Sequence, residues 1–365
     1  MSSLNLAFKT LYYAALGFIG AAGYTLTNDE IEINNANVQE QTTIQTSIED
    51  TISSTIKYND ALPNFDAAHI EFDTKKIPVI MLHNIHEQEN RYTISPNNFR
   101  KLLEDLNNNN FYSVTLEEYT TGNFSRLPIG AKPMLITADD ASTGQFMLNN
   151  DGSICSNSLV GIIEDHYTER GIKNYVTFFV SPGEKNKFQE PFMQDGLAHK
   201  KMNMLLDLGH NIGFHTDDHA NNTNATKNNI YKQYIVSKAL LNYYIGEERF
   251  KDIDIKAYAH PYGATPKNRE VADSLHSFYD VTFLAWGGPS HHPLSINYDP
   301  HAITRIELTY QTRHLVLNAR NTYKVTPETK KYYEYMNLDK DTFYVQTLPN
   351  MPLKQLKTNN NIFNP

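Results

Sequence analysis

Short apolar runs recur along the chain and predict buried strands. The clearest run is at 77–82 (IPVIML), and others follow at 133–137, 175–180, 255–259 and 281–284, with one more leading into Gly213. Runs of ~4–8 apolar residues are typical of strands that are covered on both faces. The pattern therefore indicates a sheet that is buried on both sides.

Segments with helical spacing separate these runs. After Ser95, apolar residues recur at 99, 102, 103 and 106, which places them on one face of a helix that the serine caps. Further helices are predicted at 158–170, where Gly171 ends the pattern, and at about 201–208. Strands that alternate with helices predict an α/β fold with a parallel sheet, either a barrel or a doubly wound sheet.

The first 75 residues depart from this pattern. An uncharged stretch at 11–26 follows Lys9, and its length lies between those of a signal-peptide core and a membrane span. We interpret 1–27 as an export signal or membrane anchor; a buried N-terminal helix is the alternative. Residues 28–75 are polar and acidic, which predicts a disordered tether. These features favour an extracytoplasmic protein that is secreted, periplasmic or membrane-anchored.

The remaining chain divides into a folded domain at 76–310 and a polar, tyrosine-rich extension at 311–365, to which we assign no role. The net charge is −9, from 32 basic and 41 acidic residues, which argues against a nucleic-acid partner. Cys155 is the only cysteine, so the chain cannot form an internal disulfide. The cysteine content therefore does not distinguish exported from cytoplasmic proteins.

Four polar clusters directly follow predicted strands. They are HTDDH at 215–219, TADD at 137–140, AHPYG at 259–263 and LHN at 82–84. Two histidines four apart would by themselves suit a polar surface loop equally well. The carboxyl ends of parallel strands, however, meet at one face of an α/β fold, where sites form. Four clusters at four strand ends therefore predict one polar site.

The clusters together resemble the motifs of the NodB-homology polysaccharide deacetylases, carbohydrate esterase family four. The family's T-F-D-D is TADD here, its H-[ST]-x-x-H is HTDDH, and the A-x-P-Y-G of one branch is AHPYG. The resemblance covers about 77–308 and includes an insert at 144–166 and the pair Arg305-Ile306. It implies a distorted (β/α) barrel and a hydrolase that removes acetyl groups from polysaccharides with one divalent metal.

The resemblance also implies roles for individual residues. Asp140, His215 and His219 would bind the metal, and Asp139 would be the general base. Two imidazoles and one carboxylate leave a position open on Zn²⁺, so we expect zinc, with Co²⁺, Ni²⁺ or Mn²⁺ as alternatives. Such an ion lowers the pKa of bound water to ~7 and polarises a carbonyl.

The third motif and a tryptophan are expected to contact the substrate. The backbone N–H near Tyr262, next to Pro261, would help to bind the oxyanion. Trp286 lies where the family often lines its acetyl pocket, although a core residue is the alternative.

Two departures from the family pattern bear on the site. Ala138 replaces the phenylalanine of T-F-D-D, from which we expect a wider site. Ala259 occupies the position of the arginine that orients the base in many members. Arg305 is the candidate replacement, and a purely structural salt bridge is the alternative.

The general acid is predicted to be His83. Many family members place this histidine on a final strand, but here the first strand, IPVIML, runs into His83. One branch, which includes biofilm glucosamine-polymer deacetylases, is circularly permuted in this way. An imidazole that titrates near neutral pH suits protonation of a leaving amine. The alternatives are a structural role for His83, or an acid at His291 or His292.

The resulting hypothesis is an exported enzyme that removes N-acetyl groups from a GlcNAc-containing polysaccharide, either peptidoglycan or an exopolysaccharide. One alternative is an esterase of O-acetylated xylan or another polysaccharide. Another is a carbohydrate-binding pseudoenzyme, which the missing third-motif arginine favours. A metallopeptidase is disfavoured because the chain lacks H-E-x-x-H.

Overall fold

The computed structural model describes residues 76–128, 130–183, 190–253 and 255–308. The predicted export signal, the tether and the C-terminal extension all lie outside these ranges. Among the helices within them, none has the length and apolar character that a membrane span requires.

Eight parallel strands form the main sheet. They are β2 (Val79–Leu82), β5 (Phe111–Ser113), β6 (Lys132–Asp139), β7 (Val176–Val180), β8 (Asn211–Phe214), β9 (Ala257–Ala259), β10 (Val281–Phe283) and β12 (Ile306–Glu307). Their order is β10-β9-β8-β7-β6-β2-β12, and β5 pairs with the first half of β6. Two small sheets join β1 (Lys76–Ile77) to β11 (Ser290–His291) and β3 (Asn84–Ile85) to β4 (Thr93–Ile94).

A short segment near the end of the domain connects the two edges of this sheet. Ile303 bridges Phe283 of β10 in parallel, and three residues later Ile306 pairs with Ile80 of β2. The strands therefore curl into a distorted (β/α) barrel and not into an open, doubly wound sheet. The first long strand, β2, lies inside the sheet between β6 and β12, as a circular permutation requires.

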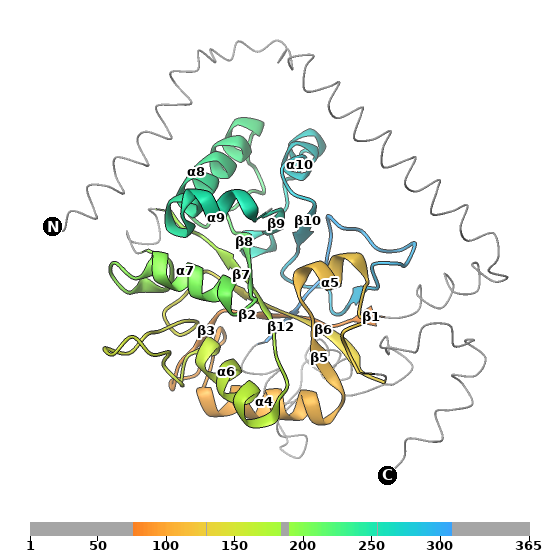
Figure 1. Ribbon diagram of the computed structural model, residues 1–365. Coiled ribbons are helices and arrows are strands. Elements are labelled where there is room, and N and C mark those ends of the chain that lie inside the picture. Colours follow the sequence, from red (N-terminus) through yellow and green to blue (C-terminus); the bar gives the residue numbers. More distant parts are fainter. Residues whose placement is uncertain (1–75, 129, 184–189, 254, 309–365) are drawn as a thin grey trace, which may run out of the picture.

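Helices surround the strands on the outside (Figure 1). They are α4 (Pro96–Asn108), α5 (Leu116–Thr121), α6 (Leu159–Arg170), α7 (Ala198–Asp207), α8 (Lys227–Ile245), α9 (Glu247–Asp252) and α10 (Arg269–His276), with single 3₁₀ turns η1 (Pro191–Met193) and η2 (Pro261–Gly263). Ser95 and Ser158 cap α4 and α6 through their side chains, and Gly171 ends α6 with a left-handed φ of 69°. These caps agree with the sequence pattern.

Alternation along the strands separates two layers of core. Leu135, Phe179 and Ala259 belong to the cluster inside the barrel, whereas Ile136 and Ala138 belong to the cluster between strands and helices. Successive strand residues point to opposite faces, which explains the division. The expectation that Ala138 widens the site is therefore wrong, because its side chain packs in the outer layer, on the face opposite Asp139.

Candidate functional site

Three predicted ligands meet at the carboxyl ends of the strands. Asp140 directly follows β6, and His215 directly follows β8, with His219 in the loop beyond it. One ligand atom from each residue lies within 4.8 Å of the other two. The Oδ1 atom of Asp140 lies 3.4 Å from Nε2 of His215 and 3.3 Å from Nε2 of His219.

Hydrogen bonding orients one of the imidazoles toward the carboxylate. Nδ1–H of His215 donates to the backbone carbonyl of Ala259 at 2.8 Å, which leaves the lone pair of Nε2 facing Asp140. Metal-binding histidines are commonly fixed through their second ring nitrogen in this way. The ring of Tyr262 contacts His219 edge-on, with the ring centroids 4.4 Å apart.

The donor set fits a divalent cation. Oδ1 of Asp140 is buried and has no hydrogen-bond partner among the described residues, although two imidazole nitrogens face it. An ion between these three atoms would satisfy all of them. Two nitrogens and one carboxylate oxygen are typical of catalytic zinc sites that keep a position open.

The electrostatics of the three residues are consistent with this arrangement. Burial alone would raise the pKa of Asp140, but His215, with smaller effects of His83 and His219, lowers it below its ordinary value. Burial would lower the pKa of His215, but Asp139 and Asp140 raise it. The carboxylate is therefore ionised when the pH is neutral.

Asp139 is not one of the three candidate ligands and instead pairs with Arg305. The guanidinium donates from Nη1 to Oδ1 at 2.7 Å and from Nη2 to Oδ2 at 2.8 Å. Both residues are buried, and Arg305 also donates to the carbonyl of Leu284 and the hydroxyl of Thr137. Burial would raise the pKa of Asp139, but Arg305 and His215 lower it.

Left-handed backbone conformations gather around the site. Among the described residues, eight non-glycine residues have positive φ, and five of them are at or beside the predicted motifs: Asp140, Ala141, Thr216, His219 and Tyr262. Such conformations cost ~1–3 kcal/mol each and cluster at functional sites. The loops that carry the candidate ligands are therefore held in conformations that the surrounding fold must impose.

His83 lies beside this group at the end of β2. Its charge contributes to the lowered pKa of Asp140, its Nδ1 atom is buried without a described partner, and its ring packs against Tyr92 at 5.1 Å. Gln145 donates through one amide nitrogen to the carbonyls of both His83 and Asp139. This contact ties the ends of β2 and β6 together.

The two alternative candidates for the general acid, His291 and His292, lie after β10 and not at the end of β2. His291 is in β11 and contacts Lys76 of β1 through its ring. His292 is fully buried against Phe124, and burial lowers its pKa to about 4.

Trp286 is on the surface and is not a core residue, because 47% of it is exposed. Its ring lies against Gly263, where an added Cβ atom would be 3.2 Å from the indole. Its Nε1–H donates to Glu307 at 3.1 Å, and Arg91 pairs with the same carboxylate oxygen at 3.3 Å. Arg91 also stacks on Tyr92, and Tyr92 packs against His83. These contacts therefore link Trp286 to His83 through Glu307 and Arg91.

Sequence reasoning missed Gln145, Arg91, Tyr92 and Glu307. None of them belongs to a motif, and none directly follows a predicted strand. Gln145, Arg91 and Glu307 reach the site through contacts between segments that are distant in the chain. Tyr92 reaches it by packing on the ring of His83. The sequence alone carried no signal for these contacts.

Comparison with models of known protein families finds no match, and no curated protein matches the sequence. Solved structures do match. The Streptococcus pyogenes deacetylase PplD, in complex with acetate, is 18% identical at a TM-score of 0.50 and covers 72% of this chain and 99% of its own. A polysaccharide deacetylase from Bacillus cereus is 16% identical at a TM-score of 0.50, covering 72% and 69%.

IcaB from Ammonifex degensii is 15% identical at a TM-score of 0.44 and covers 71% of this chain and 97% of its own. The two matches at a TM-score of 0.50 agree with the resemblance that the motifs indicate. The chain has the fold of the polysaccharide deacetylases.

Proposed function

We propose that this protein is a metal-dependent deacetylase that removes N-acetyl groups from a GlcNAc-containing polysaccharide. The convergence of Asp140, His215 and His219 on one point, with Asp139 held beside them by Arg305, carries the proposal. Together these residues would supply a cation site and a separate ionised carboxylate, which are the two components that metal-assisted amide hydrolysis needs.

Each residue would contribute one step. Asp140, His215 and His219 would hold the ion, most simply Zn²⁺, which when bound supplies an activated water and polarises the acetyl carbonyl. Asp139 would take the proton from the attacking water, and Arg305 would keep its carboxylate oriented. As the carbon–nitrogen bond breaks, His83 would protonate the departing amine. The products are acetate and a free glucosamine unit.

The substrate would be held by the groups at the rim. The backbone N–H of Tyr262 would donate to the developing oxyanion, and Pro261, which begins η2, would help to fix that turn. The exposed ring of Trp286 would cover one side of the acetyl group. The hydrogen bond from its Nε1–H to Glu307 holds the ring in place before the substrate binds.

Metal analysis tests the proposal directly. We expect about one divalent ion per chain in the purified protein and a large loss in His215→Ala. We also expect acetate release from a panel of N-acetylated chitooligosaccharides and cell-wall fragments. Equal metal in both proteins would reject the site, and release from O-acetylated xylan alone would reassign the enzyme as an esterase.

The carbohydrate-binding pseudoenzyme is the weaker candidate. Its support was the missing arginine of the third motif, but Arg305 forms the ion pair with Asp139 that this arginine would form. Oligosaccharide binding without acetate release by the metal-loaded protein would favour it.

An extracytoplasmic location is part of the same proposal. The uncharged stretch at 11–26 supports it, and polysaccharides of this kind lie outside the cytoplasm. Cell fractionation that recovers the full-length protein from the cytosol alone would reject it.

A further inference from the structure

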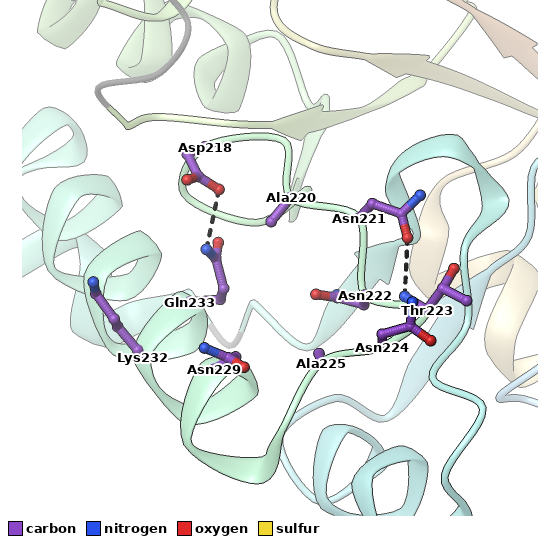
Figure 2. Close-up of a pocket in the computed structure, with 10 residues that line it drawn as sticks. All are labelled: Asp218, Ala220, Asn221, Asn222, Thr223, Asn224, Ala225, Asn229, Lys232 and Gln233. Atoms are coloured by element: carbon purple, nitrogen blue, oxygen red, sulfur yellow. Dashed lines mark hydrogen bonds between the residues drawn. The ribbon is translucent and has the colours of Figure 1, made fainter.

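A pocket of about 650 Å³ lies between the loop that follows β8 and the first turns of α8 (Figure 2). Asp218 and Ala220 belong to its lining and stand on either side of His219 in the chain. One wall of the pocket is therefore the loop that carries a candidate metal ligand. Its volume is in the ~300–1,000 Å³ range of small-molecule sites.

The lining chemistry suits a neutral, polyhydroxylated ligand. Five lining side chains are carboxamides: Asn221, Asn222, Asn224, Asn229 and Gln233. Each carboxamide both donates and accepts, as sugar hydroxyl and acetamido groups do. The charged lining residues, Asp218 and Lys232, have opposite signs, so the pocket favours neither anions nor cations. An apolar ligand would find two alanines and little else.

Hydrogen bonds hold the pocket in shape. Gln233 of α8 accepts from the backbone N–H of Asp217 at 2.8 Å and donates to the carboxylate of Asp218 at 3.0 Å, so the helix holds the loop (Figure 2). Asn222 is buried and donates to the hydroxyl of Tyr258 at 2.7 Å. A site that exists before the ligand arrives loses less entropy on binding.

The same contacts couple the pocket to the candidate active site. Ala220 donates through its backbone N–H to the hydroxyl of Thr216 at 2.8 Å, which closes the loop around His219. Tyr258 precedes Ala259, whose carbonyl orients His215. The pocket and the candidate metal site therefore share the loop that carries His219.

We infer that this pocket binds a second sugar unit of the polysaccharide, close along the polymer to the unit that loses its acetyl group. The inference rests on the proposed function and extends it: the enzyme would prefer oligomers long enough to fill both sites. Because the lining is neutral, the occupant would be an N-acetylated unit and not a deacetylated, cationic one.

The test removes lining side chains that are not needed for the fold. Asn224 and Lys232 line the pocket, whereas Asn222, Asn229 and Gln233 also hold the loop or cap the helix. The double variant Asn224→Ala/Lys232→Ala is therefore compared with Asn228→Ala, which removes an exposed carboxamide of α8 that is not in the lining.

Two measurements on the full-length protein distinguish the possible failures. The first is the dissociation constant for β-1,4- and β-1,6-linked N-acetylglucosamine hexamers. The second is kcat/KM for acetate release from the N-acetylglucosamine monomer, which cannot fill both sites, and from the hexamer. Two lost hydrogen bonds at ~0.5–1.5 kcal/mol each predict about tenfold weaker hexamer binding and a similar loss of kcat/KM on the hexamer. The monomer reaction in the double variant and all reactions in the Asn228→Ala variant should be unchanged.

Several outcomes would overturn the inference. They are unchanged hexamer affinity in the double variant, an equal loss on monomer and hexamer, or a wild-type protein that binds neither hexamer. A wild-type protein that binds a hexamer but releases no acetate would instead reject the proposed activity, and the double variant's affinity would still decide whether the pocket binds sugar.

Discussion

Adjacent carboxylates at the end of β6 face different partners because neighbouring strand residues point in opposite directions. Asp139 turns into the barrel, where Arg305 binds both of its oxygens. Asp140 follows with a left-handed φ of 78° and faces the two histidines. The backbone turn between them separates Asp139, the proposed base, from Asp140, a candidate metal ligand.

We predict that Asp139→Asn keeps the metal but loses most activity. Removing the general base should lower turnover by ~10²–10⁴-fold. The buried Arg305 would also lose its charged partner, and breaking a buried pair costs ~3–5 kcal/mol of stability. Metal content, melting temperature and acetate release should be measured on the same folded sample. A folded variant without metal would show that Asp139 is a ligand and that the two aspartates exchange roles.

His83 allows a second test at this scale. We predict that His83→Ala binds metal normally but turns over at least ~100-fold more slowly, because the leaving amine loses its acid. His86→Ala, three residues away and exposed, is the matched control and should be near wild type. Normal kcat in His83→Ala, with a large loss in His291→Ala or His292→Ala, would transfer the role to those residues.

The position of β8 depends on one close contact, between Gly213 and the ring of Phe179 in β7. A Cβ atom added at Gly213 would lie 2.5 Å from two ring carbons of Phe179, which belongs to the neighbouring strand. His215 follows two residues later. The absence of a side chain at Gly213 therefore lets β8 lie close enough to β7 to place the ligand.

We predict that Gly213→Ala lowers stability by about 1–3 kcal/mol, as overpacking does, and also weakens metal binding because β8 must shift. Ile212→Val on the same strand should cost ~0.5–1.5 kcal/mol without moving the strand, so its metal affinity should be normal. Thermal unfolding and metal titration compare the two. Unchanged metal affinity in Gly213→Ala would show that the strand tolerates the methyl group.

Element prediction succeeded where the local pattern was strong. The buried runs at β2, β6, β7 and β10 were recognised within two residues at each end, since apolar strands covered on both faces have a clear sequence signature. The two-residue strand β12 was missed because its pairing with β2 depends on closure of the barrel. The long helix α8 was missed as well, although Thr226 and Asn229 form a capping box at its start.

The same contrast applies to the site. Its motif residues stand at strand ends, so their convergence followed from the parallel topology. The contacts of Gln145 with His83 and of Glu307 with Arg91 were not predictable, because they join segments far apart in sequence through side chains whose directions only the folded backbone sets.

Several histidines are buried across the whole molecule. Burial lowers the pKa of His210, His260 and His292 to about 3, 3 and 4, with Lys173 adding to the effect at His210. Nδ1 of His210 accepts the backbone N–H of Val176, and its Nε2 lies 4.0 Å from Glu164. Each folded-state pKa is below the ordinary value of ~6.5, so the unfolded chain binds more protons between the two values.

It follows that these three histidines disfavour unfolding most above pH 6.5, and that each contribution falls by about 1.4 kcal/mol per pH unit as the pH falls toward 4. We predict a steep drop in melting temperature between pH 6.5 and 4.5 and a shallower drop in His210→Gln, which removes one titrating group. His199→Gln, at an exposed position, should keep the wild-type slope. A chelator in every sample prevents metal release from contributing. The slope of melting temperature against pH is the quantity to compare, because His210→Gln also alters the packing against Phe178 at every pH.

Identical slopes in wild type and His210→Gln would mean that His210 is protonated in the folded protein without cost. The acid sensitivity would then arise from other groups.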